Sequence, residues 1–547
     1  MTRVRLPAMS LPSFSLNFAA RRVRLIAAIV AGLALAWGGS AYWAGLQAEK
    51  TLDEQYRLLT GLPFFVVKSH SYDRGWFSST ETTELTFNKK LFAPYMGMLP
   101  EQAAGWLDST VRYTNTVEHG PLPGLRDFDF RPARALVKTE FAMSDATRKT
   151  LEKFFGDQPP VTVTNRLNFS GGGTLAIRIP RFDYEETLSG VKVAWQGLDT
   201  TVQYDAGYAH YAVDASMPGL LVKAATKGEV QLRGLSYVSD HRPGTSGVTL
   251  GSSELKVSRI ELDSKESLPY EIKLNELVYL LTRLRVGEFI NPVGEIRPSR
   301  VDLDGLAYQI VTSEQDDFVN TRGKLSFASL DLNQKRYGPM RLDVSANHLH
   351  GPTLVSLDKA LSAIPVEGVE PAQLREQYLE TVKAKGLPLL TNNPKILIND
   401  FYLKLPAGDV KVQGDLALTG LTDADLQTPT AFLKKVDARL EVEVPKQTLE
   451  DLVVAQARNL FVVDQTAEDP PSLDEIDDLA KNLLASQLDV WQEARYLTLS
   501  QGQVKTRMSW QQGKIRVNDQ PVSLPWEEET AHEPAGPDGA PAGNVTH

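Results

Sequence analysis

Cysteine is absent from this chain of 547 residues. Disulfide bonds, thiol catalysis and cysteine-ligated metal centres are therefore excluded. An exported protein can use disulfides to stabilise a small core. This chain must instead derive its stability from buried apolar surface, and it is long enough to build a sizeable core and more than one domain.

Recognisable catalytic and phosphate-binding motifs are also missing. No glycine-rich loop is followed by Lys-Ser or Lys-Thr, and the chain has neither a Gly-x-Ser-x-Gly elbow nor a His-Glu-x-x-His helix. The glycines at 170–174 lie between two alternating segments and predict a hairpin turn. These absences favour a non-enzymatic protein, and no cofactor is expected.

A net positive charge is confined to the N-terminal segment. The net charge is −10, residues 1–24 carry five arginines and no acid, and residues 527–547 carry five acids and no base. The chain between them therefore also carries −10, which excludes the basic footprint of a nucleic-acid-binding protein. The segment 526–547 is acidic and rich in Pro, Gly and Ala, and we predict that it is disordered.

One long apolar run is present, at residues 25–46. As a helix it would span roughly 33 Å, enough for a bilayer core. All five nearby arginines precede it, which predicts a cytoplasmic N-terminus, and Trp37, Tyr42 and Trp43 lie where aromatic-belt residues would. The small residues at 39–41 also fit the cleavage site of a signal peptide. The length of the run favours an uncleaved transmembrane signal anchor.

Strand patterns dominate the rest of the chain. Residues 161–169 and 174–180 alternate around a glycine turn, and 401–418 form a second hairpin around 406–409. Further strands are predicted at 191–195, 201–213, 229–234, 253–262, 305–311, 323–332, 340–350 and 436–444, with a last hairpin over 502–518 that turns at 511–514. Each has one apolar and one polar face, as in an antiparallel sheet with one side packed.

Helices are predicted at 144–156, 371–386, 448–463 and 472–491. Ser472 and Glu475 have the spacing of a capping box, while Pro371 and Gly386 suit the two ends of a helix. The predicted fold is mainly β with interspersed helices (α+β): a long curved antiparallel sheet, a sandwich or an open barrel behind a single N-terminal transmembrane helix.

The predicted organisation has six parts. These are a cytoplasmic basic segment (1–24), the transmembrane signal anchor (25–46), a β-rich region (47–350), a helical insertion (351–390), C-terminal hairpins and helices (391–525) and the acidic tail (526–547).

Two groups of side chains have residue types that suit metal binding or acid chemistry. His348 and His350 would share the apolar face of their strand and could bind a metal if a neighbouring strand supplied a carboxylate. A strand end that emerges from the sheet explains them more simply. Glu441 and Glu443 lie on the polar face of their strand and are expected to be solvated.

The stretch SHSYDRGWFSST (69–80) is dense in reactive-looking side chains. We predict a hairpin that turns at 73–75, with Trp76 or Phe77 in the core and Arg74 paired with a carboxylate or with backbone carbonyls. In the alternative, Ser78 or Ser79 is a nucleophile and His70 is its base.

The order of anchor, SYDRGWFSSTETTEL, VEHGPLPG (117–124) and GKIRVNDQPVSL (513–524) resembles the YdgA-like family of Gram-negative inner-membrane-anchored proteins of unknown function. The resemblance runs to about Leu524 and departs from the family pattern at Asp519, where a glycine is expected. It implies a bacterial inner-membrane protein with a β-rich periplasmic body and carries no catalytic residues. Its most specific residues are Arg74, Gly75, Trp76, Phe77, His119, Gly120 and Pro121.

Three functions remain open. A looser architectural similarity to AsmA-like envelope proteins, with the many amphipathic strands, favours a non-enzymatic protein that binds a lipid, a lipoprotein or another envelope partner along its sheet. The second is a scaffold or homodimer that associates through helices 371–386 and 448–491. The third is an envelope hydrolase that uses His70 or His119 with nearby Ser or Asp side chains.

Overall fold

The computed structural model describes residues 16–61, 65–88, 110–186, 190–265, 299–364, 371–460 and 472–522. Strands dominate, and every strand pair with an assigned register is antiparallel. The predicted class, mainly β with interspersed helices, is confirmed. The chain divides into two compact units. Unit 1 comprises residues 1–181 and 197–215, and unit 2 comprises 182–196 and 216–547.

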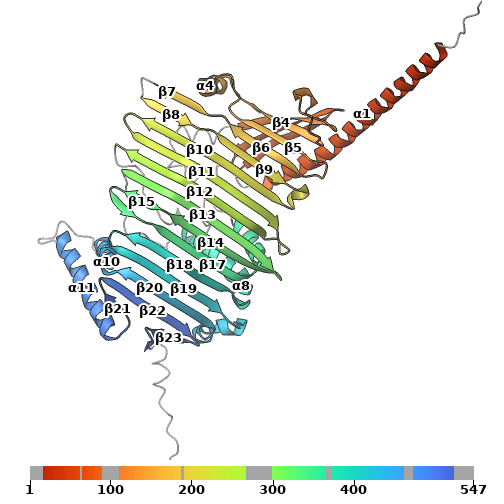
Figure 1. Ribbon diagram of the computed structural model, residues 1–547. Helices are drawn as coiled ribbons and strands as arrows, with labels where there is room; N and C mark the ends of the chain where they lie inside the picture. The colour runs from red at the N-terminus through yellow and green to blue at the C-terminus, as the bar shows by residue number, and fades with distance from the viewer. Residues whose placement is uncertain are drawn as a thin grey trace, which may run out of the picture. The chain divides into compact units, whose positions relative to one another are not determined.

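Unit 1 is an antiparallel sheet in the order β1-β2-β3-β4-β5-β6-β9, crossed by the long helix α1 (Leu16–Gly61). Figure 1 shows α1 passing beside β4, β5 and β6. The strands are β1 (Phe65–Arg74), β2 (Ser78–Phe87), β3 (Thr110–His119), β4 (Ala135–Ala142), β5 (Thr162–Leu167), β6 (Gly173–Ile179) and β9 (Leu198–Tyr204). The shorter elements are η2 (Leu125–Asp127), α4 (Asp145–Phe155) and η3 (Ala206–Tyr208).

The core of unit 1 lies between α1 and the sheet. Ala48 and Leu52 of α1 pack against a buried cluster from four strands, which contains Val117, Ala135, Val137, Leu167 and Tyr204. From residue 28 to 37, in contrast, α1 is exposed on all sides although it is apolar. Residues Ala28–Thr60 of α1 pass the length and composition test for a membrane span. An all-round apolar surface is typical of a helix that meets lipid.

Unit 2 is a larger antiparallel sheet (Figure 1). Its principal order is β11-β12-β13-β14-β17-β18-β19-β20-β22-β23-β24, with β15 and β16 joined through β13, β21 joined to β22, and β7-β8-β10 as a further set. The bounds are β7 (Phe182–Glu186), β8 (Val191–Trp195), β10 (Tyr211–Ala224), β11 (Gly228–Pro243), β12 (Thr249–Ser264), β13 (Arg300–Gln315), β14 (Phe318–Phe327), β15 (Ser329–Leu332), β16 (Lys335–Tyr337), β17 (Met340–His350), β18 (Lys395–Leu405), β19 (Gly408–Leu418), β20 (Val436–Pro445), β21 (Thr498–Ser500), β22 (Gln503–Gln511), β23 (Lys514–Val517) and β24 (Gln520–Val522).

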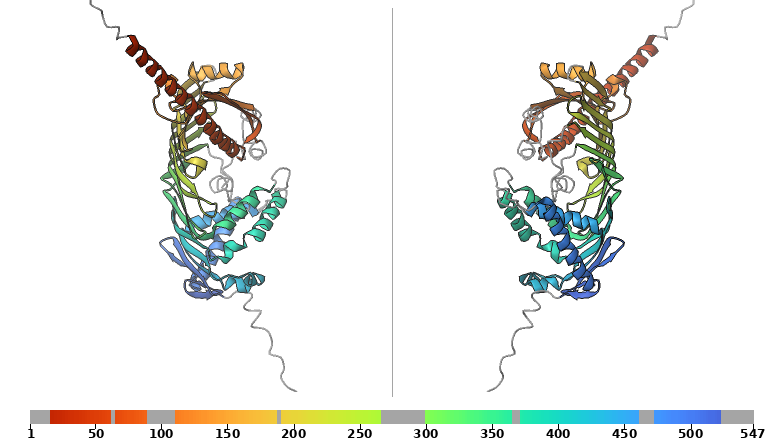
Figure 2. Two further views of the ribbon diagram at one scale, coloured as in Figure 1. Left: turned by 90° about the vertical axis from the view of Figure 1, so that its right-hand side faces the viewer. Right: turned by 90° about the vertical axis from the view of Figure 1, so that its left-hand side faces the viewer.

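The helices of unit 2 lie on the concave side of its curved sheet (Figure 2). Two small cores form where they meet it, one with Leu418, Leu421 and Val436 and one with Leu488, Leu497 and Val504. The helices are α6 (Gly351–Ser362), α7 (Pro371–Lys385), α8 (Leu387–Thr391), η5 (Asp423–Gln427), α9 (Pro429–Leu433), α10 (Lys446–Leu460) and α11 (Leu473–Glu493).

Most predicted elements are present. The hairpins β5–β6, β18–β19 and β22–β23 are confirmed, and α11 begins with the predicted capping box of Ser472 and Glu475. The strand predicted over 201–213 is wrong, because β9 ends at Tyr204 and a turn separates it from β10. Gly207 in that turn has φ +62°, a left-handed conformation that interrupts a strand. The predicted tail at 526–547 lies outside the described residues.

Candidate functional site

The hairpin of β1 and β2 turns two residues later than predicted. Arg74 pairs with Ser79, so the turn comprises Gly75, Trp76 and Phe77 rather than residues 73–75. Gly75 is required here by space, because a Cβ atom would lie 2.3 Å from the carbonyl oxygen of Ser78. The side chains of Trp76 and Phe77 are 58% and 52% exposed. The prediction that one of them fills the core is therefore wrong.

Two side chains of this hairpin reach α1. Trp76 Nε1 donates to the carbonyl oxygen of Gly38 at 3.2 Å, and its ring lies 5.1 Å from that of Tyr42. Arg74 Nη1 donates to Glu49 Oε2 at 2.8 Å, and its guanidinium lies 5.5 Å from the centre of the Tyr42 ring. The predicted pairing of Arg74 with a carboxylate is confirmed. Both residues connect β1 and its turn to the N-terminal helix.

His119, the last residue of β3, is buried against the same helix. Its Nδ1 lies 3.0 Å from the carbonyl oxygen of Ala41, and its Nε2 lies 3.1 Å from Ser79 Oγ. A carbonyl can only accept, so Nδ1 carries the proton and Nε2 accepts from the Ser79 hydroxyl. Burial lowers the pKa of His119, and the nearby Arg74 charge lowers it further, while the Ala41 carbonyl opposes them. The imidazole is therefore held neutral.

Two glycines allow the helix to come this close. A Cβ atom on Gly45 would lie 2.7 Å from the His119 ring, and one on Gly120 would lie 3.4 Å from Ala41 Cβ. Gly120 also has φ +136°, which favours glycine. Pro121, next in the chain, begins the connection from β3 to β4 and is partly exposed. The two sequence signatures, 74–77 and 119–121, therefore meet at one stretch of α1.

The Ser79–His119 pair has the distance of a nucleophile and its base. Both side chains are buried, however, at 2% and 4% exposure, and the third member is the Ala41 carbonyl rather than a carboxylate. His70 does not pair with Ser78 or Ser79 as the hydrolase alternative required. Its Nδ1 lies 3.0 Å from Thr83 Oγ1, and its ring stacks on Tyr56 of α1. The arrangement fits a clamp on α1 better than an accessible catalytic site.

Further polar groups bind the C-terminal half of α1. Gln55 Nε2 donates to the Tyr204 hydroxyl, which donates to Asn165 Oδ1, and Asn165 Nδ2 donates back to Gln55 Oε1, at 2.8, 2.8 and 3.1 Å. This closed ring joins α1 to β5 and β9. One turn earlier, buried Arg134 donates to Thr51 Oγ1. Buried polar groups paired in this way fix one arrangement of helix and sheet.

The sequence did not predict the residues of α1 that contact the sheet. Gly38, Ala41 and Gly45 lie within the predicted anchor and Ala48 just after it, yet Ala41 and Ala48 are fully buried. Small residues at intervals of three and four are the signal that could have revealed a docked face. The uncharged run concealed it, because a membrane span also contains small residues.

In unit 2, register places the apolar side chains of successive strands on one face. Val257 pairs with Leu306, Tyr308 with Leu325, and Leu325 with Leu342. The alignment continues through β18, β19, β20 and β22 in the pairs Leu342–Phe401, Phe401–Val412, Val412–Val442 and Leu440–Met508. We call this the apolar face; it extends from β11 to β22.

The apolar face is only partly covered by the rest of the chain. Among the described residues of β11 to β18, Val257 and Val319 are the apolar side chains on it that are fully buried. Ile396, Leu416 and Met508 on the same face are 39–49% exposed. Side chains in the middle of a large sheet are normally buried by a second layer.

The opposite face carries ion pairs. Glu441 pairs with Arg507, and Glu443 pairs with Lys411 and Lys505, so the prediction that these glutamates lie on a polar face is confirmed. The same face has the pairs Arg322–Asp343 and Arg341–Asp400. From β14 to β22 the sheet therefore separates charge from apolar surface.

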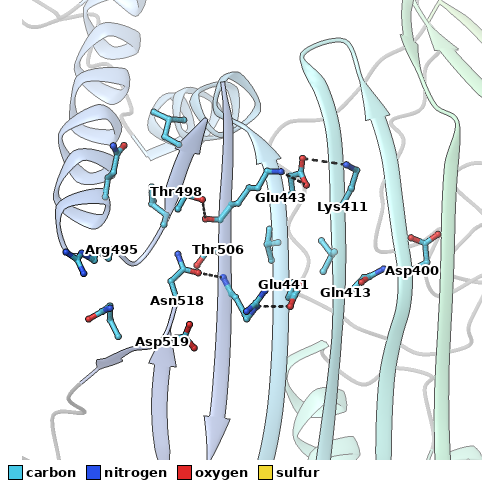
Figure 3. Close-up of a pocket in the computed structure, with 18 residues that line it drawn as sticks. Asp400, Lys411, Gln413, Glu441, Glu443, Arg495, Thr498, Thr506, Asn518 and Asp519 are labelled. Carbon is cyan, nitrogen blue, oxygen red and sulfur yellow. Dashed lines mark hydrogen bonds and ion pairs between the residues drawn. The ribbon is translucent and has the colours of Figure 1, made fainter. Parts of the chain in front are cut away.

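A cavity of about 810 Å³ opens on this charged face (Figure 3). Acidic and basic side chains line it in equal number: Asp400, Glu441, Glu443, Asp519, Lys411, Arg495, Lys505 and Arg507. Several are already paired with one another, as Figure 3 shows for Glu441 and Glu443. The lining offers no excess charge for an ionic ligand.

The histidines of β17 do not lie on the apolar face as predicted, and both of their rings contact Phe318. A bulge lies between the pairs Thr321–Ala346 and Val319–Leu349, so Leu349 takes the position on the apolar face. His348 has φ +59° and stacks on Phe318, while His350 Nδ1 lies 2.7 Å from Thr353 Oγ1. Within the described residues, no group of three or more His, Asp and Glu could hold a metal ion.

Comparison with known proteins places the chain. A family model described as "Bacterial protein of unknown function (DUF945)" matches residues 22–525. Protein YdgA of Escherichia coli (strain K12) is 22% identical over 538 residues, which cover 91% of this chain and 94% of that protein. No solved structure matches. The match covers most of α1, the residues that hold it and the greater part of both compact units, and the chain therefore belongs to the DUF945 family of bacterial proteins of unknown function.

Proposed function

We propose that the protein is a non-enzymatic component of the bacterial cell envelope, anchored in the inner membrane by α1. In this proposal the N-terminus is cytoplasmic, both compact units are periplasmic, and the apolar face of unit 2 binds the acyl chain of a lipid or another hydrophobic envelope ligand. The observation that carries the proposal is the continuous, partly exposed apolar face from β11 to β22.

The orientation of the anchor rests on charge. The five arginines of residues 1–24 precede the span, and the polar, sheet-forming chain follows it. The helix is exposed and apolar on all sides from residue 28 to 37, which is unfavourable in water and favourable in lipid.

The preference for an acyl chain follows from the shape and chemistry of the apolar face. Large contiguous apolar surface on a soluble unit is a binding site or an aggregation hazard. The side chains on this face are aliphatic and aromatic, and they run across many strands rather than converge on a few polar groups. A long, flexible hydrocarbon matches such a surface better than a compact polar metabolite.

The test is native mass spectrometry and lipid extraction on the detergent-purified full chain, with two matched variants. Ile396→Asn alters a 49% exposed side chain on the apolar face, and Val311→Asn alters a 44% exposed one on the charged face. We expect bound lipid in the native protein and in Val311→Asn, and a several-fold loss in Ile396→Asn. Equal lipid content in the two variants, or no lipid in the native protein, would reject the proposal.

A scaffold or homodimer is the second candidate, and one observation favours it. Leu479, Leu483 and Val490 form a stripe on α11 that is 51–61% exposed, beside the buried stripe of Ile476, Ala480 and Leu488. A second apolar stripe suits packing against another helix. Crosslinking at native abundance should then give a dimer that Leu483→Glu abolishes; a strictly monomeric native protein would reject it.

A further inference from the structure

The clamp on α1 leaves too little free helix to cross a bilayer. From residue 28 on, where the side chains of α1 are described, the first residue to contact the sheet is Gly38, through Trp76. The uncharged part before it, residues 25–37, spans about 20 Å as a helix, whereas a hydrocarbon core is about 30 Å thick. If α1 spans the membrane, the bilayer therefore extends past Gly38, to a level near Ala44.

At that level the helix is already accompanied by the sheet. Trp76 contacts Gly38 and Tyr42, and His119 contacts Ala41 and Gly45. The order of contacts along α1 identifies this end of the sheet. Val117 of β3 and Val137 of β4 lie farther from the β3–β4 connection, and they pack with Ala48 and Leu52, which lie later in α1. The turn at 75–77 and the end of β3 form the sheet edge nearest the membrane. We call residues 75–77 and 120–130 the membrane-side edge.

Five exposed side chains of this edge are apolar or aromatic. Trp76 and Phe77 in the β1–β2 turn are more than half exposed, and so are Phe128 and Phe130 in the β3–β4 connection, at 83% and 64%. Leu125 in the same connection is 47% exposed. Tyr42 and Trp43 on the adjoining turn of α1 are 37% and 51% exposed. Amphipathic aromatic rings favour the headgroup level of a bilayer.

The two carboxylates of the edge are paired with cations, so they do not prevent the edge from lying at an anionic membrane surface. Asp129 pairs with Arg131 and Arg166, and Asp127 pairs with Lys138. Arg126 is exposed and adds a cation that an anionic headgroup could meet. The edge therefore presents aromatic side chains without unpaired negative charge at the depth where the helix contacts require the interface to lie.

We propose that the membrane-side edge of unit 1 inserts Trp76, Phe77 and the exposed rings of the β3–β4 connection into the interface of the bilayer that α1 spans. The inference rests on the proposed anchoring by α1 and is independent of any ligand on unit 2. The protein would then have two membrane contacts, one transmembrane and one interfacial, held together by the clamp. The membrane-side edge would therefore contact the headgroups and the upper acyl layer of the phospholipids.

The absence of cysteine makes a direct test available, since each engineered thiol is unique. Leu33→Cys, Phe77→Cys and Glu152→Cys would each be labelled with the environment-sensitive fluorophore NBD in the full chain. Glu152 lies in α4, which follows the far end of β4, and serves as the matched control. The labelled proteins are reconstituted into phosphatidylethanolamine–phosphatidylglycerol vesicles that contain a nitroxide near the headgroup or deep in the acyl chain.

We expect the deep nitroxide to quench the Leu33 label most strongly, the shallow one to quench the Phe77 label at least twofold more than the deep one, and neither to quench the Glu152 label. A Phe77 label as unquenched as Glu152, with Leu33 quenched, would overturn the inference while leaving the anchor intact. An unquenched Leu33 label would remove the anchor and the inference with it. Phe128→Cys, at the most exposed ring, repeats the test if Phe77→Cys misfolds; a label shielded from water but not quenched would indicate a protein contact and also overturn the inference.

Discussion

At the scale of single residues, one helix accounts for three of the predicted signature residues. Arg74, Trp76 and His119 each contact α1, and Gly75 and Gly120 provide the close approaches that bring them there. A Ser–His pair with the spacing of a catalytic dyad serves here as a buried hydrogen-bond relay to a helix carbonyl. The burial of this pair, which no local sequence pattern reveals, distinguishes a structural role from a catalytic one.

Gly45 and Gly39 give a matched test of the clamp. Gly45→Ala would place a methyl group 2.7 Å from an imidazole that is hydrogen-bonded at both nitrogens, whereas a Cβ on Gly39 meets no atom within 4 Å. We expect Gly45→Ala to cost about 1–3 kcal/mol, the usual range for overpacking. Gly39→Ala should be neutral or slightly stabilising, as expected for alanine in a helix. Thermal unfolding in detergent measures both, and equal melting temperatures would contradict the clamp.

His119 also predicts a pH dependence. Because its folded-state pKa is lowered, the unfolded chain binds the proton more tightly. The stability it contributes is present above the unfolded value of about 6.5 and is lost as pH falls through the lowered folded value. The melting temperature should therefore drop between pH 7.5 and pH 5.5, and His119→Gln should show a smaller drop.

The control for that comparison is His210→Gln, which alters a 43% exposed histidine of unit 1. It should keep the native pH profile. Burial raises the pKa of Glu81, so the stability that Glu81 contributes is lost as pH rises. This opposite effect is the same in the native protein and in both variants. A native pH profile in His119→Gln would show that His119 does not titrate on unfolding.

At the scale of elements, the sequence predicted hairpins and caps well because their causes are local. The hairpin of β18 and β19 turns where Pro406 and Gly408 predict, and Ser472 caps α11 as its spacing with Glu475 requires. The turn of the first hairpin was misplaced because Asp73 and Arg74 resemble turn residues, whereas contacts with α1 keep Arg74 in the strand. Contacts between distant segments have no signature in a local window.

The cap of α11 can be measured directly. Ser472 Oγ accepts from Glu475 N at 3.2 Å, and Glu475 Oε2 accepts from Ser472 N at 2.8 Å. Ser472→Ala should cost about 1 kcal/mol and increase amide exchange in the first turn of α11, whereas Ser472→Asp should retain the cap. Identical exchange in the two variants would contradict this role.

At the scale of the whole molecule, the two compact units provide separate readouts. Gly45 and its contacts lie entirely within unit 1. Effects of distant, unconnected sites are usually additive. In hydrogen exchange, Gly45→Ala should therefore reduce protection in β3 and β4 and leave β17 to β20 unchanged. Loss of protection in both sets of strands would show that the units unfold together.

The continuity of α1 has a mechanical consequence. A single helix of 46 residues leads from the predicted span into the core of unit 1, with no linker between them. A membrane helix adjusts to a change in bilayer thickness chiefly by tilting. The clamp prevents α1 from turning independently of β2, β3 and β4. If α1 spans a membrane, such a tilt would therefore rotate unit 1 as a rigid lever and convert the thickness of the membrane into an angle of the sheet.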